Sequence, residues 1–222
     1  MKLLIVAATE FEILPTLKLL NEQAEKKNDT YLLNNHSIEI LISGVGVPLT
    51  MYNLTKIYSK KTYSLAIQVG IGGTFDSAVK LGDVFEISED KFADIGVEEA
   101  NGNFKSVFDL GFLNPDSPPF TNQALINTKT KNFNFLPKLK GITVNKVSGS
   151  NSSIAKIRES YPTAQVESME GAAFHLVNLL EDRNFMQLRA ISNYVEPRNK
   201  ENWKIELAIH NLNKSLKDFF KY

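Results

Sequence analysis

The stretch VESMEGAAFHLVNLL, residues 166–180, joins a short apolar run to a longer apolar segment with helical spacing. Two carboxylates, Glu167 and Glu170, stand on either side of Met169 at this junction. A carboxylate at a helix start is favoured by the helix dipole, but this does not explain a group of two carboxylates and a thioether between apolar residues. The stretch therefore indicates a buried strand followed by a helix, with a candidate site where they meet.

Short apolar runs rich in branched residues recur on both sides of this junction. They predict buried strands over 3–8, 38–42, 65–69, 84–87, 142–147 and 185–191. Helical spacing lies between some of them, and residues 205–219 carry an apolar stripe at three- and four-residue steps. The alternation predicts an α/β fold with a mostly parallel central sheet. Because no repeat or linker divides the chain, we expect one domain over residues 1–222.

The composition excludes several classes of function. Lys plus Arg equal Asp plus Glu at 25 each, so no net charge recruits nucleic acid or an anionic membrane. The absence of cysteine excludes disulfides and cysteine-bound metals, and His36, His175 and His210 lack metal-ligand spacing. No run approaches the ~20 apolar residues of a membrane span, and the apolar run near the N-terminus is too short and too soon followed by acidic residues for a signal peptide. We expect a cytoplasmic protein without metal, cofactor, nucleic-acid or membrane partner.

In α/β sheets, ligands bind beyond the carboxyl ends of the strands. The segments at these places are ATEFEI (8–13), ISGVGVP (42–48), QVGIGGTF (68–75), ESMEG (167–171) and RAISNYVEPRN (189–199). Glycines in the third of these allow a backbone to approach a ligand closely, although such clusters also occur where nothing binds.

Taken together and in this order, the five segments resemble the nucleosidase branch of the purine nucleoside phosphorylase superfamily. SMEGAA (168–173) followed by RAIS (189–192) is the most specific part. Within the superfamily, VESMEGAAF, RAISNYVEPRN and NWKIELAIHNLN (202–213) are most similar to the futalosine hydrolases. The resemblance implies a single-domain fold with a twisted mixed sheet, a purine nucleoside substrate and hydrolysis of its N-glycosidic bond. For futalosine, a nucleoside of the alternative menaquinone pathway, the products are hypoxanthine and dehypoxanthinyl futalosine.

The resemblance also implies roles for the acidic residues. Glu12 matches the carboxylate that activates water, whereas the alternative is a solvated residue in the first turn of a helix. Met169 would pack under the ribose and Glu170 would accept hydrogen bonds from its hydroxyls, as suits a thioether and an acceptor-only carboxylate. Glu167 is more consistent with a structural role. Arg189 would organise the carboxylates on the sugar side.

Arginine usage favours water over phosphate as the nucleophile. Phosphorylases of this superfamily hold phosphate largely with arginines from the N-terminal half, and the rigid guanidinium fork suits that task. The first arginine of this chain is Arg158. Glu12 would add negative charge where phosphate would have to bind.

Asn193 is the most informative departure from the family pattern. Methylthioadenosine nucleosidases have an aspartate there, which donates to N7 and accepts from the 6-amino group of adenine. Hypoxanthine offers acceptors at both O6 and N7, and an asparagine amide supplies neutral donors for them. Asn193 therefore favours a 6-oxopurine. Since an amide is no general acid, we expect it to stabilise the leaving base by hydrogen bonding while solvent completes the proton transfer.

Further candidate contacts lie in three loops. Gly70, Ile71 and Gly72 form the glycine turn, where Ile71 replaces a serine of the family. The loop 147–153 offers Ser148 and Gly149 but lacks the phenylalanine that stacks on the base in the family. Arg198 is a candidate for binding the benzoate carboxylate of futalosine, the alternative being a surface ion pair near a helix start.

Two other functions stay open from the residues. One is a methylthioadenosine/S-adenosylhomocysteine nucleosidase, which Asn193 disfavours. The other is a non-catalytic nucleoside-binding protein, which would have no need of Glu12. In the family a neighbouring subunit commonly covers the 5′ side of the nucleoside, and the irregular segment 99–123 is our candidate for that lid. We therefore expect a homo-oligomer.

Overall fold

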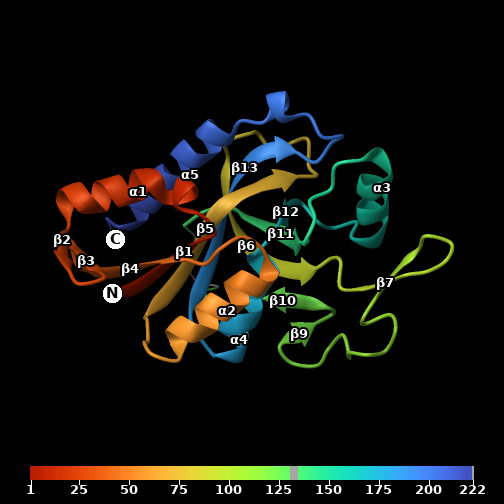
Figure 1. Ribbon diagram of the computed structural model, residues 1–222, viewed down its shortest axis with the longest axis horizontal. Coiled ribbons are helices and arrows are strands. Elements are labelled where there is room, and N and C mark those ends of the chain that lie inside the picture. Colours follow the sequence, from red (N-terminus) through yellow and green to blue (C-terminus); the bar gives the residue numbers. More distant parts are fainter. Residues whose placement is uncertain (131–134, 222) are drawn as a thin grey trace.

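The fold consists of a large mixed sheet with helices on both faces (Figure 1). A computed structural model describes residues 1–130 and 135–221. The strands are β1 Lys2–Ala7, β2 Glu25–Lys27, β3 Thr30–Leu33, β4 His36–Ile42, β5 Leu65–Thr74, β6 Val84–Phe92, β7 Gly96–Glu98, β8 Phe104–Ser106, β9 Phe120–Thr121, β10 Ala124–Ile126, β11 Lys138–Thr143, β12 Val166–Ser168 and β13 Phe185–Tyr194. The helices are α1 Glu10–Gln23, α2 Val47–Tyr58, α3 Asn151–Ser160, α4 Gly171–Leu180 and α5 Ile205–Phe219, with a 3-10 turn η1 at Lys200–Asn202.

The sheet runs β2-β3-β4-β1-β5-β12-β11-β6-β10-β9, and β13 pairs with both β5 and β6. Strands β5, β12, β11, β6 and β13 therefore form a closed circuit of pairings. Strand β1 is parallel to β4 and β5, as is β13 to β5, whereas β12 is antiparallel to β5 and β13 to β6. The sheet is mixed, as the family resemblance implied, and not mostly parallel, as the alternation alone suggested.

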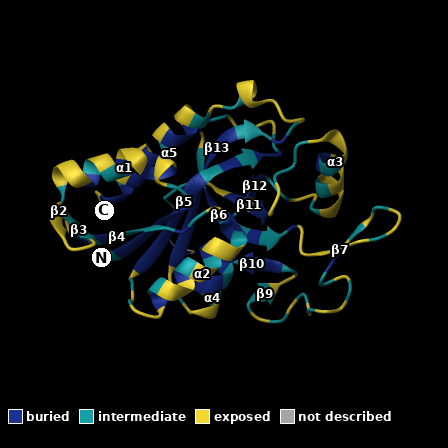
Figure 2. Ribbon diagram, in the orientation of Figure 1, coloured by how far each residue is buried: buried dark blue, intermediate teal, exposed yellow. Residues whose placement is uncertain are grey.

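Two helix pairs cover the sheet from opposite sides (Figure 1). Helices α1 and α5 pack together over one face, where Leu20, Leu212 and Leu216 join the side chains of β1, β5 and β13. Helices α2 and α4 pack together over the other, where Leu54 and Phe174 meet β1 and β5. Buried strands fill the space between them, while exposed residues lie on the outer helix faces (Figure 2). Alternating faces of β1 thus contribute to both cores.

Most predicted elements are present with shifted ends. The apolar stripe over 205–219 is α5, and the run over 185–191 is part of β13. The strand predicted over 142–147 was wrong in its bounds, because β11 spans Lys138–Thr143. The start of β11 alternates exposed lysines with a buried leucine, and Lys138 and Lys140 reach Glu86 and Glu89 of β6. Because of these two lysines, the first half of β11 does not form an apolar run, and the sequence pattern did not reveal it as a strand.

The segment 99–123 is less irregular than the sequence suggested. It contains β8, which pairs with β7 in a separate two-stranded sheet, and β9, which extends the main sheet through β10. Figure 1 shows the β7–β8 hairpin and the following loop standing away from the body of the fold. Within the described ranges, no helix is both long and apolar enough to cross a membrane.

Candidate active site

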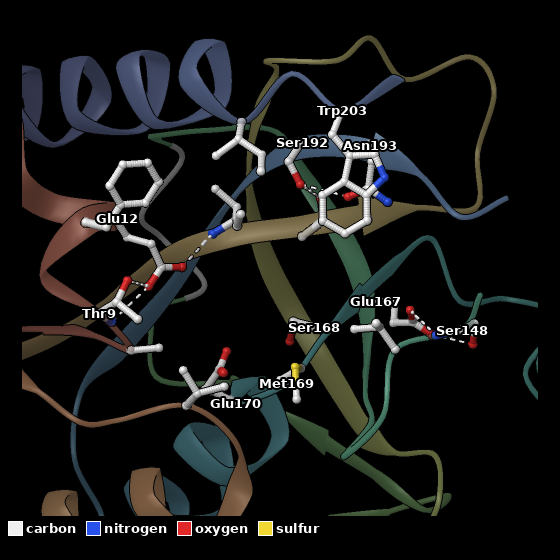
Figure 3. Close-up of a pocket in the computed structure, with 18 of the residues that line it drawn as sticks. Thr9, Glu12, Ser148, Glu167, Ser168, Met169, Glu170, Ser192, Asn193 and Trp203 are labelled. Carbon is white, nitrogen blue, oxygen red and sulfur yellow. Dashed lines mark hydrogen bonds between the residues drawn. The ribbon is translucent and has the colours of Figure 1, made fainter. Parts of the chain in front are cut away.

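A cavity of about 390 Å³ opens where the chain leaves β1, β5, β12 and β13 (Figure 3). Eight of the residues that we selected from the sequence line it: Glu12, Ile71, Gly72, Ser148, Met169, Glu170, Asn193 and Arg198. They come from segments spread over most of the chain. Each of the five segments that follow predicted strands contributes at least one residue to the cavity lining.

Glu12 combines a structural position with access to the cavity. It stands in the first turn of α1, where its Oε2 accepts from the backbone N–H and the hydroxyl of Thr9, each at 3.1 Å. Its Oε1 accepts from the backbone N–H of Ile71 at 3.2 Å. Burial raises the pKa of Glu12, Arg189 lowers it and Glu170 raises it further. The carboxylate is thus fixed at both oxygens and is a stronger base than an exposed glutamate.

Arg189 lies behind the cavity wall and connects the acidic residues. Its side chain is 1% exposed, and its Nη2 lies 3.4 Å from Glu170 Oε2 and 3.0 Å from Gln68 Oε1. Gly70 also lies behind the wall, because a Cβ there would be 2.1 Å from Arg189 Nη1 and 3.0 Å from Glu12 Oε1. A side chain at Gly70 would displace the arginine. The structure therefore places both residues under the site and not on its surface.

The helix start at Glu170 holds the second carboxylate. Glu170 is 6% exposed and is the N-cap residue of α4. Its Oε1 accepts from the backbone N–H of Gly46 at 3.1 Å, while Oε2 faces Arg189. Figure 3 shows Met169 beside Glu170 on the same side of the cavity. Ionic and backbone donors on two sides orient a carboxylate that can still accept from ligand hydroxyls.

A bulge in β13 sets the orientation of Asn193. The pairing of β13 with β5 runs Ile191 with Gly72 and then Asn193 with Gly73, so Ser192 is the extra residue. The Ser192 hydroxyl donates to Asn193 Oδ1 at 2.8 Å, and Asn193 Nδ2 donates to the carbonyl of Tyr194 at 2.9 Å. These contacts orient the amide with its nitrogen as donor. Its second N–H is available to a ligand.

The loop after β11 is held by Glu167. Ser148 donates its backbone N–H to Glu167 Oε1 at 3.0 Å and its hydroxyl to Oε2 at 2.7 Å. Gly149 does not line the cavity, but its carbonyl accepts from the backbone N–H of Arg198 at 3.1 Å. The two loops that flank the cavity mouth are therefore connected.

No model of a known protein family matches the chain. Over 158 residues the chain is 34% identical to a futalosine hydrolase of Streptomyces coelicolor, and the match covers 67% of this chain and 62% of that protein. The match thus spans slightly less than two thirds of the relative. The fold superposes on the futalosine hydrolase of Helicobacter pylori strain 26695 with a TM-score of 0.79 at 16% identity, covering 99% of this chain and 97% of the other. For a 5′-methylthioadenosine/S-adenosylhomocysteine nucleosidase of Neisseria meningitidis, in complex with methylthio-immucillin-A, the TM-score is 0.77 at 17% identity, covering 99% and 98%.

The chain shares its fold with these two kinds of nucleosidase. The likeness confirms the α/β fold with a mixed sheet and flanking helices that the sequence resemblance implied.

Several residues that line the cavity were not predicted. They are mostly apolar or small: Thr9, Phe11, Val45, Gly73, Val147, Ser168, Ser192, Trp203 and Ile205. Trp203 is the largest of them, and the guanidinium of Arg198 stacks over its ring at 5.0 Å from the centroid. The motif NWKIELAIHNLN contains this tryptophan, the only one of the chain, so its uniqueness was an available signal.

Protein donors engage the three acidic residues of the cavity. Glu12, Glu167 and Glu170 all line the cavity, but each is engaged by protein donors. Within residues 1–130 and 135–221, no group of three or more His, Cys, Asp or Glu side chains is placed to hold a metal ion.

Proposed function

We propose that this protein hydrolyses the N-glycosidic bond of futalosine and releases hypoxanthine. The observation that carries the proposal is the pair of buried carboxylates, Glu12 and Glu170, held around Arg189 in a cavity that also presents the Asn193 amide. The sequence match to a futalosine hydrolase supports the choice of substrate.

In the proposed reaction, the ribose lies on Met169 with its hydroxyls donating to Glu170. As the bond from C1′ to the base nitrogen breaks, the sugar becomes cationic and the nearby carboxylates stabilise it. Glu12 takes a proton from a water molecule whose oxygen bonds to C1′. General-base assistance of this kind contributes roughly 10²–10⁴-fold. The electron pair of the broken bond leaves with the base, which Asn193 stabilises by hydrogen bonding until solvent protonates it.

Hydrolysis is better supported than phosphorolysis. A phosphate nucleophile needs positive charge beside C1′. The buried Arg189 faces Glu170 and Gln68, and Arg198 lies at the cavity mouth over Trp203. Glu12 would repel an anion on the side where the nucleophile must stand.

Arg198 is proposed to bind the benzoate carboxylate of futalosine. It lines the cavity and, among the described residues, no carboxylate forms an ion pair with it. Stacking on Trp203 orients the guanidinium plane, and a bidentate contact with a carboxylate then costs little further ordering. Trp203 itself offers an aromatic surface to the ligand.

We further propose a cytoplasmic homo-oligomer that acts in menaquinone synthesis. The hairpin of β7 and β8 and the loop that follows it project from the fold, and Phe112 on that loop is 76% exposed. Such a segment is suited to packing against a second copy of the chain, where it would cover the neighbour's cavity.

The test is to incubate the purified protein with futalosine, inosine and methylthioadenosine in phosphate-free buffer and to measure the released bases by chromatography. Hypoxanthine from futalosine is the expected product. Adenine from methylthioadenosine as the main product would instead identify an adenine-specific nucleosidase, and no release from any of the three would favour a binding protein.

A further inference from the structure

Glu167 is a third carboxylate in the cavity, and the proposed reaction leaves it without a role. It is 5% exposed, and Ser148 alone supplies both of its hydrogen bonds. Burial raises the pKa of Glu167, which the Ser148 donors oppose. Among the described residues, no cation forms an ion pair with this carboxylate. Holding the Ser148 loop does not by itself require a carboxylate at a position that lines the cavity.

The sheet register places Glu167 and Asn193 on the two strands that flank Gly73 of β5. Gly73 of β5 pairs with Asn193 of β13 on one side and with Glu167 of β12 on the other. Since neighbouring strands are ~4.8 Å apart, the two residues stand about 10 Å apart, and paired residues project from the same face. The Asn193 amide lies close against Gly73, because a Cβ there would be 3.0 Å from Asn193 Nδ2, so a larger residue at 73 would crowd the amide. Figure 3 shows Glu167 and Asn193 at separate corners of the cavity.

The hydrogen-bonding pattern of a 6-oxopurine matches these two groups. O6 and N7 accept, and the second N–H of the Asn193 amide can donate to one of them, while N1–H donates and requires an acceptor. A carboxylate has about four lone-pair sites, and Ser148 uses one on each oxygen, so each oxygen of Glu167 can accept once more. Adenine has an acceptor at N1, which a carboxylate would repel.

We propose that Glu167 is a specificity-determining residue that accepts the N1–H hydrogen bond of a 6-oxopurine, with Ser148 holding its carboxylate in place. This inference rests on the proposed function, since it requires a purine base at Asn193. It adds a second contact that selects hypoxanthine over adenine.

The test compares the binding of hypoxanthine and adenine to the wild type, Glu167→Gln and Ser148→Ala by calorimetry. A hydrogen bond to a charged group corresponds to about 10- to 100-fold in affinity. Glu167→Gln is expected to lower the affinity for hypoxanthine by that factor without lowering the affinity for adenine. Ser148→Ala keeps the carboxylate and its backbone contact and removes only the hydroxyl that holds one oxygen, so it should weaken hypoxanthine binding less than Glu167→Gln does.

Equal weakening of both bases by Glu167→Gln, or a loss of hypoxanthine affinity no greater than that of Ser148→Ala, would reduce Glu167 to a loop anchor. Should Glu167→Gln fail to fold, Glu167→Asp, which withdraws the carboxylate by one methylene, gives the same comparison. A wild type that prefers adenine would contradict the proposed function itself, so the two failures are distinguishable.

Discussion

At the scale of single residues, Glu12 both caps a helix and faces the cavity. The capping contacts with Thr9 account for the glutamate as a helix-start residue. Burial raises its pKa and so accounts for its basicity, which the hydrogen bond from Ile71 opposes. The two roles are separable, because glutamine can keep the capping contacts but cannot take a proton.

We therefore expect Glu12→Gln to lower kcat by roughly 10²–10⁴-fold with little change in melting temperature. In the wild type, kcat/KM should fall as the pH falls through the pKa of Glu12, and burial places that acid limb above the ordinary value of 4.5. Rates from pH 4 to 8 and melting curves measure both. A variant with wild-type kcat would remove Glu12 from the mechanism.

Replacing Asn193 by aspartate should change which base the enzyme prefers. Asn193→Asp restores an acceptor that suits the 6-amino group of adenine and opposes O6 of hypoxanthine. The ratio of kcat/KM for futalosine over methylthioadenosine should fall by about tenfold or more. An unchanged ratio would show that the base is selected elsewhere.

If Arg198 binds the benzoate carboxylate, its removal should affect futalosine and spare nucleosides that lack the benzoate. Arg198→Ala should raise KM for futalosine by about tenfold and leave inosine, which lacks the benzoate, within about twofold. Lys200→Ala, in the adjacent 3-10 turn, is the matched control for loss of positive charge. Equal losses on both substrates in the arginine variant would contradict a benzoate contact.

At the scale of elements, Asn213 of α5 fastens the helix that carries Glu12. Its Oδ1 accepts from the backbone N–H and the hydroxyl of Thr16 at 3.1 and 2.6 Å, and its Nδ2 donates to the carbonyl of Glu12 at 2.8 Å. Helix α1 contains Pro15, which lacks an N–H, so an external amide at this place stabilises a weakened turn.

Asn213→Ala should lower the free energy of unfolding by about 1–3 kcal/mol, because it leaves buried groups of α1 unpaired. Asn211→Ala, on the same helix, removes a single half-buried bond to Gly82 and should cost about 1 kcal/mol or less. Urea unfolding of both variants makes the comparison. Equal effects would mean that Asn213 does not fasten α1.

Elements were predictable where an apolar pattern alone specified them, as for α5 and β13. The bounds predicted for β11 were wrong because Lys138 and Lys140 are stabilised by ion pairs with β6. Such contacts between distant segments leave no apolar pattern in the sequence. The segments that follow the predicted strands contain most of the polar side chains that line the cavity. The positions of Gly70 and Arg189 behind its wall depend on tertiary contacts, and Trp203 enters from a loop with no periodic pattern.

At the scale of the whole molecule, the interior below the site contains an unusual acid. Asp90 is fully buried, its oxygens accept from Thr143 Oγ1 at 2.9 Å and Gln187 Nε2 at 3.2 Å, and burial raises its pKa to about 7. Thr143 in turn accepts from the backbone N–H of Ala172 at the start of α4. The site is thus built on a polar interior.

A folded-state pKa above the unfolded value means that the folded chain binds the extra proton. Asp90 therefore contributes stability that is complete below pH about 4 and is lost as the pH rises to about 7, by at most about 1.4 kcal/mol per pH unit. Asp90→Asn should remove this contribution, so the free energy of unfolding of the variant should rise relative to that of the wild type between pH 5 and 8. A stability difference that is the same at both pH values would contradict a buried, titrating Asp90.

A competition between two nucleosides tests whether the protein hydrolyses a 6-oxopurine nucleoside. Futalosine and methylthioadenosine are mixed in equal amounts in phosphate-free buffer with the wild type, and with Glu12→Gln as the control. We predict that hypoxanthine appears first and almost alone, and that the glutamine variant releases little of either base. Adenine as the faster product, or release that requires added phosphate, would contradict the account.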